Sequence, residues 1–362
     1  MTANFDGADI LILGGTGSLG QRLFHRILSD ELGTPHSITV FSRDEAKQHY
    51  MRLALLQRAS ATDDVIYNEG AKRVRFVIGD VRHYSDVRQN VDRADVIFHA
   101  AALKQVPTCE YFAAAAVDTN VYGAVNLCRA MREGIRAPKT VVGVSTDKAC
   151  KPVNVMGMTK AIQERILAQA NLETPWVRCV NVRYGNVMAS RGSAIPFFLD
   201  LARSSTPIPI TDERMTRFLM TLDQAVDLIL TACKEARPGE TYVPLAPRAK
   251  VVDLARAVAG DERYPLKYTG VRPGEKIHEI LVSEEEESRT ALRGRVLAIQ
   301  PILPELRAES LGTGPVPFRG EYSSANDTLS YPEVADLLQE HRLTVASAPA
   351  GTEGYPGAQV NQ

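Results

Sequence analysis

The sequence lacks three features that would place it in several large classes of protein. Lysine and arginine (42) nearly balance aspartate and glutamate (43) over 362 residues, so no overall charge favours nucleic acid or an anionic membrane surface. The five cysteines are odd in number, widely spaced and without a C-x-x-C pair, which argues against a disulfide framework and a zinc site. No apolar run approaches the roughly 18 residues that a membrane helix needs. We expect a cytoplasmic protein with buried, reduced thiols and no metal.

Apolar and amphipathic segments alternate along the first half of the chain. This alternation predicts an α/β fold with one parallel, right-handed, doubly wound (Rossmann) sheet over residues 1–186. Beyond residue 186 the segments become short, which predicts a smaller substrate-binding lobe at 187–345, some segments of which return to the first domain, and a disordered tail at 346–362. The run Glu284 to Glu287 is expected to be the solvated start of a helix. Strands are expected within residues 8–13, 37–41, 74–83, 94–107, 140–145 and 176–187.

A glycine-rich turn follows the first predicted strand. The segment GGTGSLG has G-x-x-G-x-x-G spacing and is followed by a helical pattern. Glycines in this context allow a tight turn, a close approach of the backbone to a pyrophosphate and close packing of the helix on the strand. We therefore predict a dinucleotide-binding turn. Its predicted cofactor contacts are Gly14, Thr16, Gly17, Ser18, Leu19 and Gly20.

Ser42 and Arg43 stand at the end of the second predicted strand, where this fold selects its cofactor. An acidic residue there suits the ribose 2′-hydroxyl of NAD, whereas an arginine suits the 2′-phosphate of NADP. Asp44 and Glu45 come one position later and fit the first turn of a helix. The sequence therefore favours NADP over NAD, with Lys47 as a second cation.

Further cofactor contacts are expected where later strands end, because the carboxyl ends of parallel strands line the cofactor cleft. Asp80 would lie near the adenine, and the small residues Ala100 and Ala101 would let the cofactor lie flat on the backbone. The remaining predicted cofactor contacts are Val81, Lys104, Ser145, Lys160 and Tyr184.

The segment VSTDKACKPVNVMGMTK, residues 144–160, follows the fifth predicted strand and is dense in titratable groups. Oxidation of a sugar hydroxyl by a nicotinamide needs a base for the hydroxyl proton. In short-chain dehydrogenases this base is a tyrosine four residues before a lysine, on the same face of a helix. Lys160 is that lysine here, but Met156 stands in the place of the tyrosine. Because a thioether cannot accept the proton, either the enzyme is inactive or other groups take the role.

Several motifs together make a family resemblance specific. The chain carries GGTGSLG, FSRDE, HAAALKQVP, STDKA-x-x-P-x-N-x-MG-x-x-K, GNVMASRGSAIPFF, MTRFLM and RPGEKIHE. Over roughly residues 8–335 it resembles the UDP-N-acetylglucosamine 4,6-dehydratases of bacterial polysaccharide and nonulosonate biosynthesis, which are extended short-chain dehydrogenases/reductases. Members of that family carry either tyrosine or methionine at the position of Met156.

The resemblance implies a reaction in which the sugar is oxidised at C4 by NADP, loses water across C5 and C6, and regains hydride at C6. The product is a UDP-4-keto-6-deoxy-HexNAc. It implies that Lys148 is the base at C5 and Asp147 the acid at O6, while Lys160 holds the nicotinamide ribose. Thr146, or Ser145, would hydrogen-bond O4. An acid role for Asp147 requires a raised pKa, because the adjacent ammonium favours the carboxylate.

The resemblance also implies a UDP-sugar substrate, most simply UDP-N-acetylglucosamine, and a homo-oligomer, since members of the family are dimers or hexamers. Arginine suits a diphosphate because its guanidinium matches two phosphate oxygens at once. The predicted substrate contacts are Lys104, Asn186, Arg191, Ser193, Arg217, Arg272 and Glu275.

Other functions stay open at this point. A 4-epimerase of the same fold would have little use for the pair Asp147 and Lys148, and a 5,6-dehydratase would end the reaction differently. A non-catalytic NADP-binding regulator is compatible with the missing tyrosine, whereas the dense polar loops argue against a scaffolding protein. The configuration at C5 is also open, because the short chain without membrane helices favours inversion and Met156 favours retention.

Overall fold

A nine-stranded sheet runs through the centre of the protein, in the order β14-β15-β10-β6-β5-β4-β1-β2-β3. The computed structural model describes residues 5–56, 73–188, 193–309 and 314–348. Neighbouring strands are parallel from β10 to β3, and β15 pairs antiparallel with both β10 and β14. The strands are β1 (Asp9–Leu13), β2 (Ser37–Ser42), β3 (Val74–Ile78), β4 (Val96–His99), β5 (Thr140–Val144), β6 (Arg178–Val182), β10 (Thr241–Pro244), β14 (Thr290–Arg293) and β15 (Val296–Ile299).

The strand order reverses between β1 and β4, which confirms the predicted doubly wound sheet. At such a reversal the loops after the two strands diverge and leave a crevice at the carboxyl edge. The strand expected within residues 74–83, with Asp80 at its end, is shorter than predicted, because β3 ends at Ile78. Asp80 instead lies in a turn that is closed by its own carboxylate, which accepts hydrogen bonds from the backbone and side chain of Arg82.

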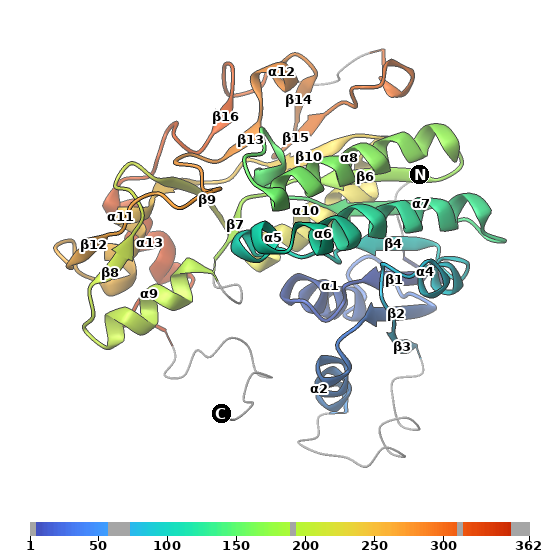
Figure 1. Cartoon of the computed structure of the whole chain (residues 1–362), viewed down its shortest axis with the longest axis horizontal. Helices are drawn as coiled ribbons and strands as arrows, with labels where there is room; N and C mark the ends of the chain where they lie inside the picture. The colour runs from blue at the N-terminus through green and yellow to red at the C-terminus, as the bar shows by residue number, and fades with distance from the viewer. Residues whose placement is uncertain (1–4, 57–72, 189–192, 310–313, 349–362) are drawn as a thin grey trace.

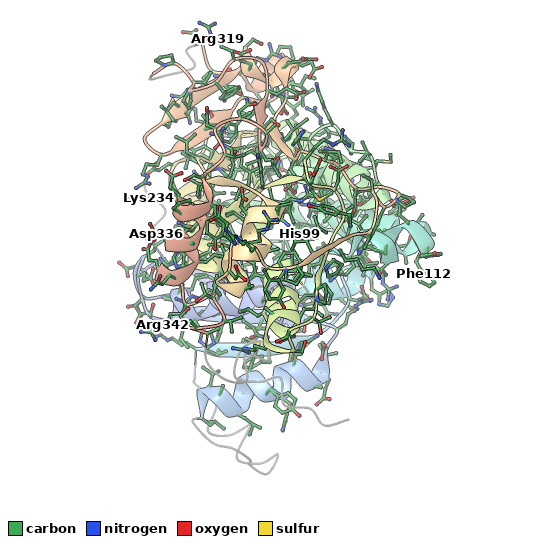
Figure 2. The ribbon with its side chains drawn as sticks, turned by 90° about the vertical axis from the view of Figure 1, so that its left-hand side faces the viewer. His99, Phe112, Lys234, Arg319, Asp336 and Arg342 are labelled. Atoms are coloured by element: carbon green, nitrogen blue, oxygen red, sulfur yellow. The ribbon has the colours of Figure 1, made fainter. Side chains whose placement is uncertain are left out.

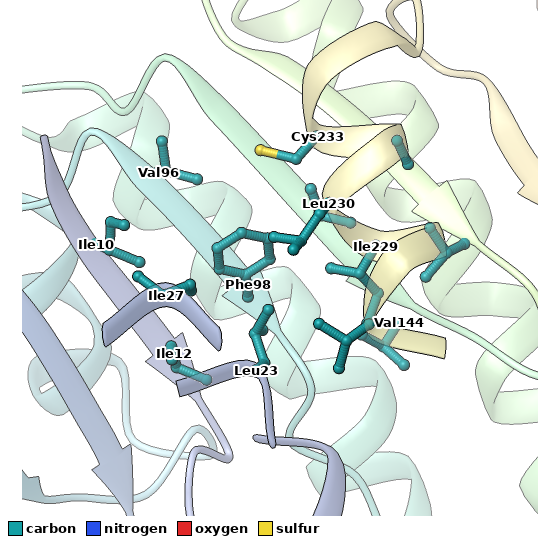
Figure 3. Close-up of a cluster of buried hydrophobic side chains, with 14 of the residues drawn as sticks. Ile10, Ile12, Leu23, Ile27, Val96, Phe98, Val144, Ile229, Leu230 and Cys233 are labelled. Carbon is teal, nitrogen blue, oxygen red and sulfur yellow. The ribbon is translucent and has the colours of Figure 1, made fainter. Parts of the chain in front are cut away.

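Helices cover both faces of the sheet (Figure 1). On one face, Phe98 of β4 lies against Leu23 and Ile27 of α1 and Leu230 of α10 (Figure 3). On the other face, Leu127 of α7 and other apolar side chains of α4 and α8 pack in a second cluster. In the described residues, no helix is long and apolar enough to cross a membrane. The helices on the sheet are α1 (Ser18–Leu28), α2 (Glu45–Leu55), α4 (Tyr84–Val91), α7 (Gly123–Glu133), α8 (Val155–Glu173) and α10 (Leu222–Glu235).

An irregular helical segment precedes α7. The sequence pattern predicts one helix over residues 120–134, but α7 begins only at Gly123 and follows a π-helix, η1 (Val117–Tyr122). Within η1 the side chain of Asn120 accepts a hydrogen bond from Leu103 N (2.8 Å) and donates one to Leu103 O (3.1 Å). The widened helical turn thus holds the loop after β4, as π-turns at functional sites often do. Two short helices come before it, α5 (Val106–Tyr111) and α6 (Ala113–Ala116).

The chain after β6 builds further elements, which we call the lobe (the described residues of 186–220, 248–288 and 314–348); of these, β13, α12 and β16 lie beside β14 and β15 of the large sheet (Figure 1). The core of the lobe holds side chains of α9, α11 and α13, such as Phe198, Leu254 and Val334. Between these parts the chain returns to the large sheet through α10, β10, β14 and β15. The elements of the lobe are β7 (Asn186–Val187), α9 (Ala194–Arg203), β8 (Ile208–Ile210), β9 (Thr216–Met220), β11 (Arg248–Lys250), α11 (Val251–Ala259), β12 (Leu266–Tyr268), β13 (Ile280–Val282), α12 (Glu284–Glu287), β16 (Tyr322–Ser323) and α13 (Tyr331–Glu340).

Two compositional expectations have different outcomes. All five cysteines are free and buried, as predicted. The acidic run does begin a helix, α12, but its predicted solvation is wrong for Glu286, which is only 7% exposed. Its carboxylate lies 2.7 Å from the guanidinium of Arg183, so a buried partner offsets the cost of burying the charge. Within the predicted tail, Ala348 O accepts a hydrogen bond from Arg203, and residues 349–362 lie outside the described residues.

Candidate active site

The catalytic segment predicted from the sequence, residues 144–160, follows β5, forms a short 3-10 helix, η2 (Asp147–Ala149), and continues into the first turns of α8. The backbone N–H of Asp147 donates to Tyr184 O at 2.9 Å, which ties η2 to the exit of β6. Helix α8 packs directly on η2 through Gly157, since a Cβ atom at this position would lie 2.1 Å from Lys148 O. Only glycine allows this approach, which explains the glycine of the MG-x-x-K motif.

Three charged side chains meet at η2, and we call them the Asp147 cluster: Asp147, Lys148 and Glu279. The Nζ atom of Lys148 lies 3.1 Å from Asp147 Oδ1 and 3.0 Å from Glu279 Oε1. The hydroxyl of Thr146 donates to the same Asp147 Oδ1 at 2.8 Å. The two carboxylate side chains are 1% and 2% exposed, whereas Lys148 is 22% exposed. Lys148 is thus held between two buried carboxylates and reaches towards solvent.

Both carboxylates of this cluster keep one oxygen without a hydrogen bond. In the described residues, Asp147 Oδ2 and Glu279 Oε2 are buried and have no partner. Asn186, Ser193 and Glu275, which the sequence predicts to bind substrate, each contain a buried oxygen in the same condition. Buried polar atoms in folded proteins are nearly always paired, so these atoms favour a polar ligand at the site.

The charges of the Asp147 cluster perturb one another. Burial raises the pKa of Asp147 despite the opposing charge of Lys148, and Glu279 raises it further. Burial works against the ammonium of Lys148, but the carboxylates of Asp147 and Glu279 raise its pKa overall. Burial also works against the Glu279 carboxylate, yet Lys148 and Arg217 lower its pKa. The raised pKa of Asp147 is the condition that an acid role at this position requires.

Lys160 is more deeply buried than Lys148 of the Asp147 cluster. It is 5% exposed, its ammonium donates to the side chain of Gln163, and burial lowers its pKa to about 7 against the opposing charge of Glu164. His99, at the end of β4, lies inside the molecule (Figure 2) and is fully buried, and within the described residues neither ring nitrogen has a partner. Burial and the charge of Lys160 lower the pKa of His99 to about 3, so the ring is neutral.

Met156 packs in an apolar cluster with Cys109 and Ala116 and is 8% exposed. Its side chain therefore fills the space between α8 and the short helices α5 and α6. This packing explains how a methionine is accommodated at the position of a tyrosine, and it supplies no proton acceptor.

The glycine turn forms a close-packed cradle between β1 and β4. Gly14 has a φ of +83°, and a Cβ atom there would lie 2.6 Å from Ala101 N. Helix α1 begins after Gly17 without a side-chain cap, so no N-cap side chain accepts a hydrogen bond from its first N–H groups. The structure thus brings the turn together with Ala100 and Ala101, and their contact with a cofactor stays a prediction.

The predicted selector of the cofactor, Arg43, is half exposed, and its guanidinium lies 3.5 Å from Asp80 Oδ2. Asp80 is 7% exposed and pairs more closely with Arg82, at 2.6 Å. Burial would raise the pKa of Asp80, but Arg82 and Arg43 lower it. The other predicted cation, Lys47, pairs with Asp44, which also caps α2.

The predicted substrate residues occupy different surroundings. Arg217 bonds Thr216 O and Ile277 O and lies 3.9 Å from Glu279, so its charge faces the Asp147 cluster. Arg272 and Lys104 are exposed, whereas Arg191 lies outside the described residues.

Sequence reasoning missed two residues of the site, Glu279 and Asn154. Asn154 caps α8 by accepting from Gly157 N and donates to Gly274 O at 2.7 Å, so it ties the catalytic helix to the loop before β13. The N-cap position of Asn154 before a helix was a readable signal. Glu279 belongs to the RPGEKIHE motif, but its neighbours in the sequence do not distinguish it from Glu275 of the same motif.

A second group of buried charges lies beside the site, and we call it the Arg183 cluster: Glu164, Arg183 and Glu286. The guanidinium of Arg183 lies 2.7 Å from each carboxylate. The hydroxyl of Ser145 donates to Glu164. Ser145, predicted to contact the cofactor, is therefore engaged in this internal network.

Comparison with known proteins gives the family. Residues 10–301 match the family described as polysaccharide biosynthesis protein. A protein of Rickettsia bellii named UDP-glucose 4-epimerase is 41% identical over 286 residues, covering 77% of this chain and 79% of that protein. The X-ray structure of Pen from Bacillus thuringiensis is similar with a TM-score of 0.80 and 31% identity, covering 94% of this chain and 99% of Pen.

A more distant neighbour shares the fold alone. It is the crystal structure of DesIV, a dTDP-glucose 4,6-dehydratase from Streptomyces venezuelae with NAD and TYD bound. It has a TM-score of 0.60 and 19% identity, and the match covers 74% of this chain and 86% of DesIV. From the sequence match and the shared doubly wound fold, the chain belongs to the polysaccharide biosynthesis protein family.

Proposed function

We propose that the protein is an NADP-dependent 4,6-dehydratase that acts on UDP-N-acetylglucosamine. The observation that carries this proposal is the Asp147 cluster, which sets a buried carboxyl of raised pKa beside the Lys148 side chain, which reaches solvent. An elimination needs an acid and a base on one small region of the substrate, and this pair supplies both. The family description and the names of the relatives support a nucleotide sugar as substrate.

The residues of the glycine turn fit a dinucleotide. The cradle that a Cβ atom at Gly14 would fill, and the uncapped first turn of α1, suit a pyrophosphate. Arg43 would hold the 2′-phosphate of NADP, and Lys160 the nicotinamide ribose. The DesIV structure, with its bound NAD, supports a cofactor of this class in the fold. A bound nicotinamide would supply the hydride chemistry, as acceptor for the C4 hydrogen and donor to C6.

Thr146 and Asp147 together take the role of the missing tyrosine as acceptor of the 4-hydroxyl proton. Thr146 accepts the proton of the sugar 4-hydroxyl while its own hydroxyl proton passes to Asp147 Oδ1, 2.8 Å away. With the proton gone from O4 and the C4 hydrogen removed as hydride, C4 becomes a ketone, which acidifies the hydrogen at C5. Asp147 is left protonated, the state that the elimination requires.

In the elimination, Lys148 in its amine form takes the proton from C5. The electron pair of the C5–H bond forms the C5=C6 double bond, and the C6–O6 bond breaks. Asp147 gives its proton to O6, which leaves as water. Lys148 then returns a proton to C5 when hydride reaches C6, so the product differs from the substrate by one water.

A second candidate is the 4-epimerase, favoured by the name of the Rickettsia relatives. An epimerase at C4 breaks no C–O bond and uses no acid at O6. The buried Asp147 cluster is therefore unexplained by that function, and we rank it second.

The test is incubation of the protein with UDP-N-acetylglucosamine and NADP, followed by mass spectrometry and proton NMR of the sugar. The dehydratase gives a mass lower by one water and a C6 methyl signal, whose couplings report the C5 configuration. A 4-epimerase gives unchanged mass and an altered C4 proton. A 5,6-dehydratase gives the loss of water with alkene protons in place of the methyl. A regulator leaves the sugar unchanged, and each of these last three outcomes refutes the proposal.

A further inference from the structure

We propose that Glu279 is the proton acceptor that converts Lys148 from ammonium to amine before the step at C5, and that it returns the proton afterwards. This inference rests on the proposed function. Glu279 acts through Lys148 and touches no reacting atom, so it is a positioning residue in the elimination.

The geometry favours proton exchange between these two side chains. Lys148 Nζ lies 3.0 Å from Glu279 Oε1, a hydrogen-bond distance, and Glu279 is 2% exposed. Glu279 stands immediately before β13 and reaches the cluster from the lobe. Its backbone N–H donates to Ser324 Oγ at 2.9 Å, which fixes the residue in place. The second oxygen, Oε2, has no partner among the described residues and stays available for a proton.

A proton acceptor is needed because Lys148 is charged at rest. Both carboxylates of the cluster raise the pKa of Lys148. An ammonium cannot take a proton from C5. Asp147 cannot take the ammonium proton of Lys148, since in the proposed reaction Asp147 has already received the proton of the 4-hydroxyl. Glu279 is the other carboxylate in contact with Lys148.

Other charged groups around the Asp147 cluster affect the proton transfer from Lys148 to Glu279. Arg217 of β9 and Lys276 of the loop before β13 both face Glu279, and Tyr184 at the exit of β6 faces Asp147. The two cations keep Glu279 ionised at rest. The charge of Arg217 also opposes the ammonium form of Lys148, which favours the amine.

The proton count closes over one turnover. At rest Asp147 and Glu279 are ionised and Lys148 is charged. The 4-hydroxyl proton moves to Asp147, and Lys148 gives its own proton to Glu279 and takes the C5 proton. Asp147 protonates O6 and water leaves. Lys148 then reprotonates C5 as hydride arrives at C6, and Glu279 returns its proton to Lys148, which restores the starting state.

The experiment replaces Glu279 with glutamine, which keeps the shape but accepts no proton. At neutral pH we expect Glu279→Gln to lower the dehydration rate by about 100-fold, the usual scale of acid–base assistance. Formation of reduced nicotinamide in the first half-reaction should persist. The lost rate should return as the pH is raised, because Lys148 then loses its proton to solvent. Glu279→Asp should retain most of the activity, and the exposed Glu284→Gln serves as the matched control.

A rate loss that is equal at every pH, and that extends to nicotinamide reduction, would indicate a structural role and refute the inference. A second measurement does not depend on turnover. The rate at which acetic anhydride labels Lys148, followed against pH by mass spectrometry, gives its titration midpoint. We expect a lower midpoint in Glu279→Gln, since one of the charges that raise the pKa is gone. An unchanged midpoint overturns the inference, whereas a wild-type protein that releases no water refutes the proposed function instead.

Discussion

The Asp147 cluster and the Arg183 cluster are both buried, but they differ in how completely their carboxylate oxygens are hydrogen-bonded. In the Arg183 cluster all four carboxylate oxygens of Glu164 and Glu286 accept hydrogen bonds. In the Asp147 cluster one oxygen of each carboxylate has no partner within the described chain. Buried charges that are fully paired are fixed in one state, whereas incompletely paired ones can exchange protons with a ligand. We therefore regard the first cluster as structural and the second as chemical.

The largest expected effect is on the chemical cluster. Lys148→Ala should reduce dehydration by about 10³-fold or more, because the base at C5 is removed. Binding of NADP, measured by fluorescence titration, should be unchanged. Lys151→Ala, which removes a neighbouring lysine paired with Glu284 on the surface, is the control and should turn over normally. If Lys148→Ala turned over at the wild-type rate, the assignment of the base would be wrong.

The next effect is on the structural cluster. Arg183→Met leaves Glu164 and Glu286 buried without their shared cation, so the free energy of unfolding should fall by about 3–5 kcal/mol. Urea denaturation measures this loss. Arg129→Met removes an exposed pair with Glu133 and should not change the midpoint measurably. Equal stability of the two variants would show that the Arg183 cluster contributes nothing to folding.

A neutral substitution in each cluster should give opposite changes in stability. Arg183 outweighs the effect of burial and lowers the pKa of Glu286 to about 2, so its carboxylate stabilises the fold above its ordinary pKa and loses this effect as the pH falls through about 2. Glu286→Gln should thus cost about 1–3 kcal/mol at pH 7 and nothing below pH 2.

The pKa of Asp147 is raised, so the folded state holds its proton more tightly than the unfolded chain does, and ionisation at higher pH costs stability. Asp147→Asn should leave the free energy of unfolding at pH 7 unchanged or increase it while it removes dehydration. On the same samples, thermal unfolding measures the stability of Asp147→Asn and the product mass shows whether it still releases water. A large loss of stability in Asp147→Asn would remove the distinction between the clusters.

The smallest effect concerns a residue outside both clusters. Arg43→Ala should raise the KM for NADP by about tenfold, as one charge-assisted contact is lost, and leave the KM for NAD unchanged. Steady-state kinetics with each cofactor measures the change. If Arg43→Ala alters neither KM, Arg43 does not select the cofactor.

Much of the fold could be predicted because it follows from patterns of neighbouring residues in the sequence. The alternation of strands and helices predicts the doubly wound sheet, and the spacing of Gly14, Gly17 and Gly20 predicts the turn after β1. Asp147 and Lys148 are adjacent in the sequence, so their pairing needs no long-range information. Glu279 was not predictable in this way, since only the packing of the lobe against η2 brings it to Lys148.

The solvation predicted for the run Glu284 to Glu287 was wrong for Glu286, and long-range packing is again the cause. Four successive glutamates have no periodicity that shows which one faces the core, and the partner of Glu286 lies in the distant segment after β6. The π-helix η1 was also not predictable from the sequence pattern, because the hydrogen bonds of Asn120 with the loop after β4 join segments that are 17 residues apart.

The most direct test of the account is the mass of UDP-N-acetylglucosamine after incubation with NADP and either the wild-type protein, Lys148→Ala or Arg183→Met, under conditions where all three are folded. We expect loss of one water with the wild type and with Arg183→Met, and unchanged substrate with Lys148→Ala. Unchanged mass with the wild type, or loss of water with Lys148→Ala, would contradict the assignment of Asp147 and Lys148 to a dehydration.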